Sequence, residues 1–180
     1  MICGVSAALT AGQTPQIALG DVVGLPPIIG GRPTVLILGN APSVLSLATQ
    51  QSYGNPRNSF WRITGELFGF DPAAPYAERT AALIERGIAV WDVLQFCRRT
   101  GSLDSAVEPD SMVPNDFDTF FTGHPTLRRV FFTGGAAEAN YRRLVRVTAE
   151  LTYTRLPSTS PAHTMALAAK LAAWRAALEL

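Results

Sequence analysis

Four short runs of β-forming residues, separated by helical patterns, most constrain how this 180-residue chain can fold. They cover residues 34–38, 87–91, 129–133 and 151–156. The first run, TVLIL, is almost wholly apolar and ends at Gly39, which is typical of a strand buried on both faces of a parallel sheet. The last run alternates in polarity and ends at Pro157, which indicates an edge strand or one face in water.

Helical patterns fill the segments between these runs. Apolar residues at helical spacing and strong helix formers predict helices over residues 59–68, 75–86, 115–121, 136–150 and 163–180. Strands that alternate with helices predict a three-layer α/β/α sandwich around a central, mainly parallel four-stranded sheet. Ligands in such folds bind at the carboxyl ends of the strands.

The first 24 residues differ from the rest of the chain. They are apolar, but Gly12 and Pro15 interrupt them, and they contain no Lys or Arg that would begin a signal peptide. We therefore expect a poorly ordered extension over residues 1–24 and a single domain over residues 25–180. No apolar run reaches the roughly 18 residues of a membrane span, so we expect no membrane partner, and the low cysteine count leads us to expect a cytoplasmic protein.

Cysteine and histidine are scarce. The chain has two cysteines, Cys3 and Cys97, and two histidines, His124 and His163. Two cysteines are too few for a disulfide framework, and no carboxylates stand at ligand spacing from the histidines. We expect neither a metal ion nor another cofactor.

The formal net charge of +1 conceals an uneven distribution. Residues 1–127 carry seven arginines and eleven acidic residues (net −4), whereas residues 128–180 carry eight basic and three acidic residues (net +5). A fold that gathers the second set on one face would give the protein a cationic surface.

Polar and small residues follow each predicted strand. These segments are residues 39–43, 92–94, 134–135 and 157–161. The first opens a twenty-residue interruption, 39–58, that places amides and aromatic residues close together, as a functional loop does. The sequence thus predicts one site at the carboxyl edge of the sheet.

The residues of these segments resemble a known family. Residues 36–61, LILGNAPSVLSLATQQSYGNPRNSFW, are similar to the first motif region of the uracil-DNA glycosylase superfamily, most closely its hypoxanthine-DNA (deoxyinosine) glycosylase branch. Further matches follow in order: GIAVWDVLQFC at 87–97, GSLDSAV at 101–107, VFFTGG at 130–135 and LPSTSPA at 156–162. The resemblance implies a monofunctional enzyme of base-excision repair that flips a deaminated base, most simply hypoxanthine, out of DNA and hydrolyses its N-glycosidic bond. The implied partner is single- or double-stranded DNA, bound by a monomer.

The resemblance also implies roles for the first motif. Asn58 corresponds to the family's catalytic amide and would orient the attacking water, while its ordinary alternative is to cap the helix expected from residue 59. Phe60 is the candidate stacking platform for the base, with core packing as the alternative, and Tyr53 is a second aromatic candidate. Asn55 stands where this branch usually has His.

Three further residues are candidates at the site, Asn40 for catalysis and Gly39 and Asp92 for binding the base. Asn40 is either a second water-positioning amide or a turn residue, and Gly39 beside it allows a close approach of the backbone. Asp92 follows the second strand, where an ionised carboxylate would accept the N1–H of hypoxanthine, a donor that adenine lacks. Its alternative is to cap a turn over residues 93–97.

The DNA-binding residues are expected in two loops. Ser158 and Ser160 would donate to phosphates, while Pro161 and Ala162 would press toward the gap left by the flipped base. Leu156 occupies the place of a histidine in uracil-excising relatives, which argues against efficient uracil excision. The further DNA-contact candidates are Ser43, Arg57, His163, Arg142, Arg143, Arg146 and Arg155.

Two other functions remain open from the sequence. One is a catalytically weak DNA-binding module of the same fold, in which Asn55 marks lost chemistry. The other is a hydrolase of small nucleotides or esters with Ser43 as nucleophile, although Ser43 lacks a Gly-x-Ser-x-Gly elbow and neither histidine has an evident acidic partner.

Overall fold

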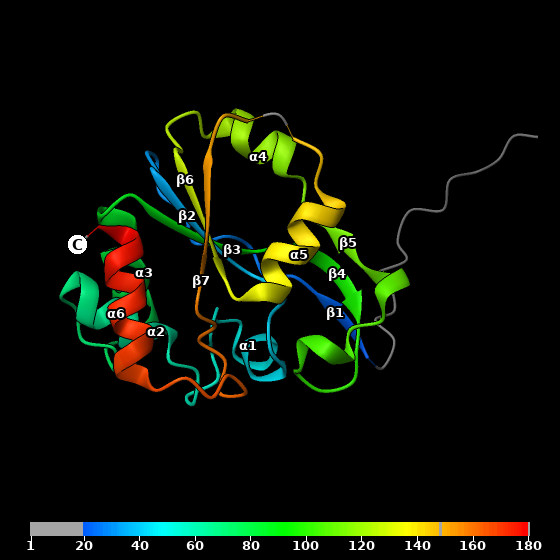
Figure 1. Cartoon of the computed structure of the whole chain (residues 1–180), viewed down its shortest axis with the longest axis horizontal. Helices are drawn as coiled ribbons and strands as arrows, with labels where there is room; N and C mark the ends of the chain where they lie inside the picture. The colour runs from blue at the N-terminus through cyan, green and yellow to red at the C-terminus, as the bar shows by residue number, and fades with distance from the viewer. Residues whose placement is uncertain (1–19, 148, 180) are drawn as a thin grey trace, which may run out of the picture.

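A four-stranded parallel sheet forms the centre of the computed structural model, which describes residues 20–147 and 149–179. In spatial order its strands are β3 (Ile88–Asp92), β2 (Val35–Gly39), β6 (Arg129–Thr133) and β7 (Thr152–Leu156) (Figure 1). Each neighbouring pair is parallel and in register. The predicted sheet and its four strands are therefore confirmed.

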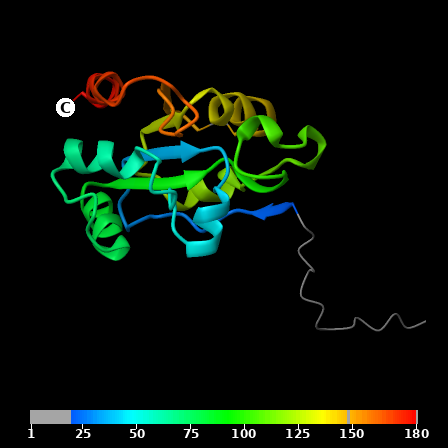
Figure 2. The same cartoon turned by 90° about the horizontal axis from the view of Figure 1, so that it is seen from below.

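Helices cover both faces of this sheet (Figure 2). The apolar side chains alternate, so that Ile37 and Phe131 join one core cluster whereas Leu38 and Phe132 join the other. The first cluster is closed by α2 (Phe60–Phe68), α3 (Tyr76–Glu85) and α6 (Leu167–Leu178), and the second by α4 (Phe117–Gly123) and α5 (Gly135–Leu144). This is the predicted three-layer α/β/α sandwich.

A second, antiparallel sheet lies beside the first. It consists of β1 (Asp21–Val23), β4 (Leu94–Arg98) and β5 (Val113–Pro114), with β4 in the middle. Val22 of β1 is 5% exposed and belongs to the core. The folded part of the chain thus begins before residue 25, which corrects the predicted domain boundary, while residues 1–19 of the expected extension lie outside the described residues.

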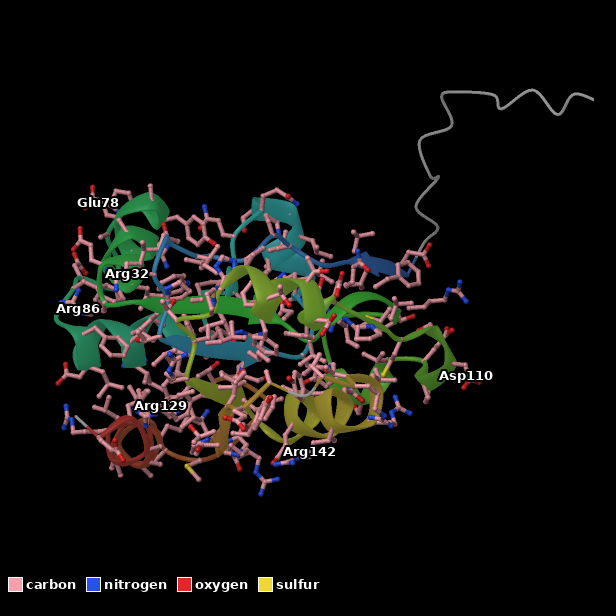
Figure 3. All side chains as sticks on the ribbon, turned by 90° about the horizontal axis from the view of Figure 1, so that it is seen from above. Arg32, Glu78, Arg86, Asp110, Arg129 and Arg142 are labelled. Carbon is pink, nitrogen blue, oxygen red and sulfur yellow. The ribbon has the colours of Figure 1, made fainter. Side chains whose placement is uncertain are left out.

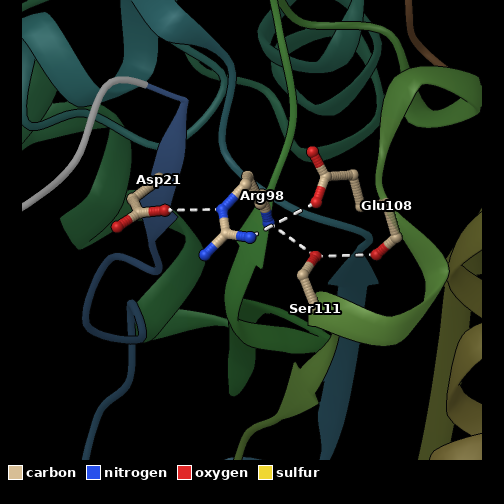
Figure 4. A network of polar contacts seen from close by, with 4 residues as sticks. All are labelled: Asp21, Arg98, Glu108 and Ser111. Carbon is tan, nitrogen blue, oxygen red and sulfur yellow. Dashed lines mark hydrogen bonds and ion pairs between the residues drawn. The ribbon is translucent and has the colours of Figure 1, made fainter.

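Polar contacts around Arg98 hold this small sheet together (Figure 4). The Arg98 side chain donates to Asp21 of β1 at 3.2 Å and lies 3.5 Å from the carboxylate of Glu108. Its backbone N–H donates to Ser111 Oγ at 2.7 Å, and Ser111 Oγ in turn donates to the Glu108 carbonyl at 2.7 Å. The segment after β4, with its short 3-10 turns η1 (Asp104–Ala106) and η2 (Pro109–Ser111), is thereby tied to the domain.

Two predicted helices and one predicted loop need correction. The helix expected over 136–150 ends at Leu144, because Val145 turns to an extended conformation and packs with Val147 against the core. The last helix begins at Leu167 rather than at residue 163. Residues 39–58 are not wholly a loop, since they contain α1 (Val44–Thr49), whose N-cap Ser43 accepts the N–H of Ser46 at 3.1 Å.

In residues 20–147 and 149–179, no helix is long and apolar enough to cross a membrane. The same residues contain no group of three or more His, Cys, Asp or Glu side chains placed to hold a metal ion.

Candidate active site

A cleft of about 200 Å³ opens at the carboxyl edge of the parallel sheet. The predicted segments after β2 and β7 line it, together with residues 102–104 from the loop after β4. β3 contributes residues 90–92 and β6 contributes Thr133, whereas the predicted segment 134–135 does not line the cleft. Figure 1 shows α1, η1 and the loop after β7 along this edge. Of the twelve predicted site residues, ten line the cleft: Gly39, Asn40, Ser43, Tyr53, Arg57, Asn58, Asp92, Ser158, Ser160 and Pro161. The other two, Phe60 and His163, do not.

Tyr53, rather than Phe60, presents its ring to the cleft. Phe60 is fully buried at 0% exposure, and its ring stacks against that of Tyr53 with centroids 3.8 Å apart and planes 6° from parallel. The expectation that Phe60 itself contacts the base is therefore wrong, because Tyr53 stands between them. The core-packing alternative for Phe60 is the one observed.

The backbone and hydroxyl of Tyr53 fix the direction of this ring. Tyr53 has φ 54°, a left-handed conformation that costs an ordinary residue roughly 1–2 kcal/mol. The Thr133 hydroxyl donates its single hydrogen to the Leu38 carbonyl, with 3.2 Å between the oxygens. Thr133 Oγ1 also lies 3.1 Å from Tyr53 Oη, and in that hydrogen bond the Tyr53 hydroxyl is therefore the donor. Burial raises the pKa of the Tyr53 hydroxyl, which stays protonated as a donor.

Asp92 lies at the end of β3 against Gly39. A Cβ atom at Gly39 would lie 2.4 Å from Asp92 Oδ1 and 3.0 Å from Tyr53 Oη, so only glycine leaves room for both groups. Asp92 keeps some solvent contact as a residue, but protein atoms surround its carboxyl group. This burial, and secondly the charge of Asp104, raise the pKa of Asp92 to about 7.

The capping alternative for Asp92 is wrong. The residues that it would cap form strand β4 instead of a helical turn. Asn115 fixes the backbone here, since its side chain donates to the Asp92 carbonyl at 2.8 Å and its N–H donates to the Val93 carbonyl at 2.9 Å. That role explains why α4 begins after Asn115, with Asp116 as its N-cap.

Asn58 combines the capping contact with a place in the cleft. Its Oδ1 accepts the N–H of Phe60, the first residue of α2, at 3.0 Å. An amide oxygen has two lone pairs, and one remains for another donor. Asn55, in the place of the usual His, stabilises the turn before it, because Asn55 Oδ1 accepts the Arg57 N–H at 3.0 Å.

Asn40 is held by two side chains that the sequence did not single out. Its Nδ2 donates to Asp104 Oδ1 at 2.8 Å, and its Oδ1 accepts from Asn140 Nδ2 at 2.8 Å. Asn40 is buried at 6% exposure, and both ends of its amide are hydrogen-bonded. It therefore fixes the position of the Asp104 carboxylate at the cleft. Asp104 lies in the GSLDSAV match and was recognisable as part of a motif, whereas nothing in the sequence marks Asn140 of α5.

The loop after β7 is firmly attached to the helices behind it. The carbonyl of Thr159 accepts both the N–H and the Oγ–H of Ser59, at 3.0 and 3.2 Å. Trp174 Nε1 donates to the Pro157 carbonyl at 3.1 Å. Lys170, which is 4% exposed, donates to the His163 carbonyl at 3.0 Å.

The serine hydroxyls of this loop remain able to donate. Ser158 Oγ accepts the N–H of Ser160, and Ser160 Oγ accepts the N–H of Ala162, both at 3.2 Å. Each hydroxyl hydrogen is thereby left for a partner at the cleft, as phosphate binding requires. Gly134, at φ 110°, packs so closely on Ser158 that a Cβ there would lie 2.9 Å from the serine Cβ.

The cationic residues of α5 and β7 do not line the cleft. Arg142 and Arg155 both pair with Glu138, at 2.9 and 3.4 Å. Figure 3 shows Arg142 on the same side of the molecule as Arg129, whereas Arg32 and Arg86 lie near Glu78 on the other side. Arg57 is the arginine that lines the described cleft.

Two curated relatives, both named hypoxanthine DNA glycosylase, are similar to this chain. The protein of Methanosarcina barkeri is 31% identical over 157 residues, which cover 87% of this chain and 97% of the relative. The protein of Methanosarcina acetivorans is 36% identical over 124 residues, or 68% of this chain and 77% of the relative.

A solved structure has the same fold. It is the solution NMR structure of a Methanosarcina acetivorans protein described as a candidate uracil DNA glycosylase, with a TM-score of 0.74 and 32% identity. The match covers 87% of this chain and 95% of that one. No family model matches the chain. Together with the cleft, these similarities show that the chain belongs to the hypoxanthine DNA glycosylase family, and that it is a DNA glycosylase of the uracil-DNA glycosylase-like fold.

Proposed function

We propose that this enzyme is a monofunctional glycosylase that removes hypoxanthine from deoxyinosine in DNA, as the first step of base-excision repair. One observation carries the proposal: an aromatic face, a carboxyl group and a fixed amide, from Tyr53, Asp92 and Asn58, line one cleft. We infer that the protein acts as a monomer in the cytoplasm on DNA that contains a deaminated base.

Asp92 and Tyr53 would recognise the flipped base. The purine would stack on Tyr53, whose ring is supported from behind by Phe60. The ionised carboxylate of Asp92 would accept the N1–H of hypoxanthine, a hydrogen bond that adenine cannot make. A pKa of about 7 leaves this carboxylate available at neutral pH and above.

Asn58 would orient the nucleophilic water. The free lone pair of its Oδ1 can accept one water hydrogen, while the bond to the Phe60 N–H keeps the amide from rotating. The water oxygen forms a bond to C1′ as the C1′–N9 bond breaks, and the electron pair of that bond leaves with the base. The sugar passes through an oxocarbenium-like transition state.

Asp104 would take the proton that the water loses, because a carboxamide is too weak a base to do so. One of its oxygens is occupied by Asn40, which holds the carboxylate at the cleft. Its negative charge would also stabilise the developing positive charge on the sugar. The proton can then pass to the departing base or to solvent.

The position of lysine supports a monofunctional enzyme. Cleavage of the DNA strand through a Schiff base requires an amine at C1′. The sequence has one lysine, Lys170, and it is buried behind the loop after β7 with its ammonium group bonded to the His163 carbonyl. It does not line the cleft.

The two alternative functions have less support. Ser43 Oγ is engaged with Ser46, and within the described residues no histidine is hydrogen-bonded to it, so a serine hydrolase would lack its general base. The inert DNA-binding module rested on Asn55, which instead stabilises the turn that carries Asn58.

Labelled duplexes with one hypoxanthine, uracil or xanthine test the proposal. After incubation with excess enzyme, alkali should cleave the hypoxanthine strand, and the same sample without alkali should stay intact. Asp104→Asn, which keeps an oxygen for the Asn40 bond but loses the charge, should slow release by about 100-fold. Binding to the hypoxanthine duplex without any base release would contradict the proposal.

A further inference from the structure

Leu103 is a large apolar side chain that stands exposed at the mouth of the cleft. It is 56% exposed and lines the cleft between Ser102 and Asp104. An exposed leucine is not unusual by itself. Leu103 stands beside a cleft that would bind DNA, however, so the apolar faces of DNA bases are available as its partner.

Both neighbours of Leu103 are anchored to the cleft wall. Ser102 Oγ accepts the N–H of Val44 at 3.0 Å, and Asp104 Oδ1 accepts from Asn40 at 2.8 Å. The polar side chains on either side thus point to the protein, and the apolar one between them is left to solvent.

A buried arginine also holds this loop by hydrogen bonds to backbone carbonyls. Arg99 is 3% exposed, and its Nε donates to the Gly101 carbonyl at 3.0 Å. Another nitrogen of the same guanidinium group donates to the carbonyl of Pro42, in the segment after β2. Three hydrogen bonds therefore join the loop that carries Leu103 to residues 40–44, and a fourth lies within the loop, so that the loop presents a fixed apolar tip.

The other DNA-binding loop has no comparable side chain. Residues 157–162 are proline, serine, threonine and alanine only. Figure 1 shows this loop and η1 on either side of α1. Proteins that bind the minor groove frequently insert an apolar side chain between base steps and partly unstack them, and small residues fill little of the gap that a flipped purine leaves.

We propose that Leu103 enters the duplex as the wedge that keeps the flipped nucleotide from returning. This inference rests on the proposed function, because it requires that the cleft binds a nucleotide flipped out of DNA. The partner of Leu103 would be the stacked bases beside that nucleotide. The leucine loses its water contact only when it lies between bases, so its transfer energy favours the flipped state.

The requirement for a wedge distinguishes double-stranded from single-stranded DNA. In a duplex the flipped base must be kept from pairing and stacking again, whereas a single strand has no complementary base to reclaim it. Leu103→Ala should therefore slow hypoxanthine release from a duplex by roughly 10-fold or more and change release from the same single strand by less than about 3-fold.

Leu45→Ala is the matched control. Leu45 is a leucine of α1 with 45% exposure that does not line the cleft, so its loss should change neither rate. Equal losses on duplex and single strand with Leu103→Ala, or no loss on either, would overturn the wedge.

A binding measurement separates this inference from the proposed chemistry. Affinity for a duplex that holds a stable abasic analogue needs no catalysis, and 2-aminopurine beside the analogue reports unstacking by its fluorescence. Leu103→Ala should reduce both affinity and fluorescence relative to wild type and Leu45→Ala. If wild type releases no base yet shows this difference, the proposed chemistry fails and the wedge stands; if Leu103→Ala binds and unstacks like wild type, the wedge fails.

Discussion

The ring of Phe60 lies directly behind the ring of Tyr53, with 3.8 Å between centroids and 6° between planes. Tyr53 lines the cleft, and Phe60 belongs to the apolar core of α2 and α6. The core thus supports a stacking surface without contributing to it. A base on Tyr53 would extend this pair to a stack of three aromatic rings.

Substitutions at these two positions should separate binding from stability. Tyr53→Leu should lower kcat/KM for hypoxanthine DNA by roughly 10- to 100-fold, because base stacking on an aromatic side chain contributes about 1–3 kcal/mol. Tyr53→Phe keeps the ring and is the control. Phe60→Leu should instead lower the free energy of unfolding by about 1–2 kcal/mol, measured by urea denaturation. A folded Phe60→Leu enzyme that loses activity while Tyr53→Leu keeps it would reverse these assignments.

Gly39→Ala should damage the site through a single methyl group. Its Cβ would overlap Asp92 Oδ1 and press on Tyr53 Oη, and a displacement of about 1 Å can cost roughly 100-fold in rate. Gly31→Ala is a suitable control, because no atom lies within 4 Å of a Cβ placed there. Single-turnover release of hypoxanthine measures both. Full activity in Gly39→Ala would show that Asp92 does not need its observed position.

The raised pKa of Asp92 predicts a pH dependence. The base-reading form is the ionised carboxylate, and its population rises as pH passes through about 7, rather than near the ordinary value of 3.8. Release of hypoxanthine should therefore increase between about pH 6 and pH 8. Asp92→Asn keeps an acceptor oxygen and should lose this dependence. An increase of the same size in Asp92→Asn would assign it to another group.

DNA binding should be salt-sensitive despite the sequence pI of 7.8. Local phosphate contacts, not total charge, release the counterions of DNA. Arg57→Ala should reduce the slope of log affinity against log salt by about 1. Arg32→Ala removes the same charge near α3, at the opposite end of β2 from the cleft (Figure 3), and should leave the slope unchanged. A flat titration of the wild-type protein would contradict this account.

The central fold could be predicted from the sequence because the runs that form β2, β3 and β6 are largely apolar, the run that forms β7 alternates in polarity, and a glycine, aspartate or proline follows each run. β1 could not, since its three residues are held by pairing with β4, far along the chain. The site shows the same division. Tyr53 and Phe60 are both aromatic residues of one motif, and only the packing of α2 against α6 shows which one faces the cleft. Asp104 meets Asn40 across 64 positions of sequence, and no local pattern records that contact.

The most direct test of the catalytic assignment is the single-turnover rate of hypoxanthine release at saturating enzyme for Asn58→Ala and Asn58→Ser. Serine retains an oxygen that can cap the helix. If both variants release hypoxanthine slowly, the lower rate is therefore not due to loss of the hydrogen bond to the Phe60 N–H. We predict that both variants release hypoxanthine about 100-fold or more slowly than wild type, while their affinity for an abasic-analogue duplex changes by less than about 3-fold. Release at the wild-type rate by either folded variant would contradict the role of Asn58.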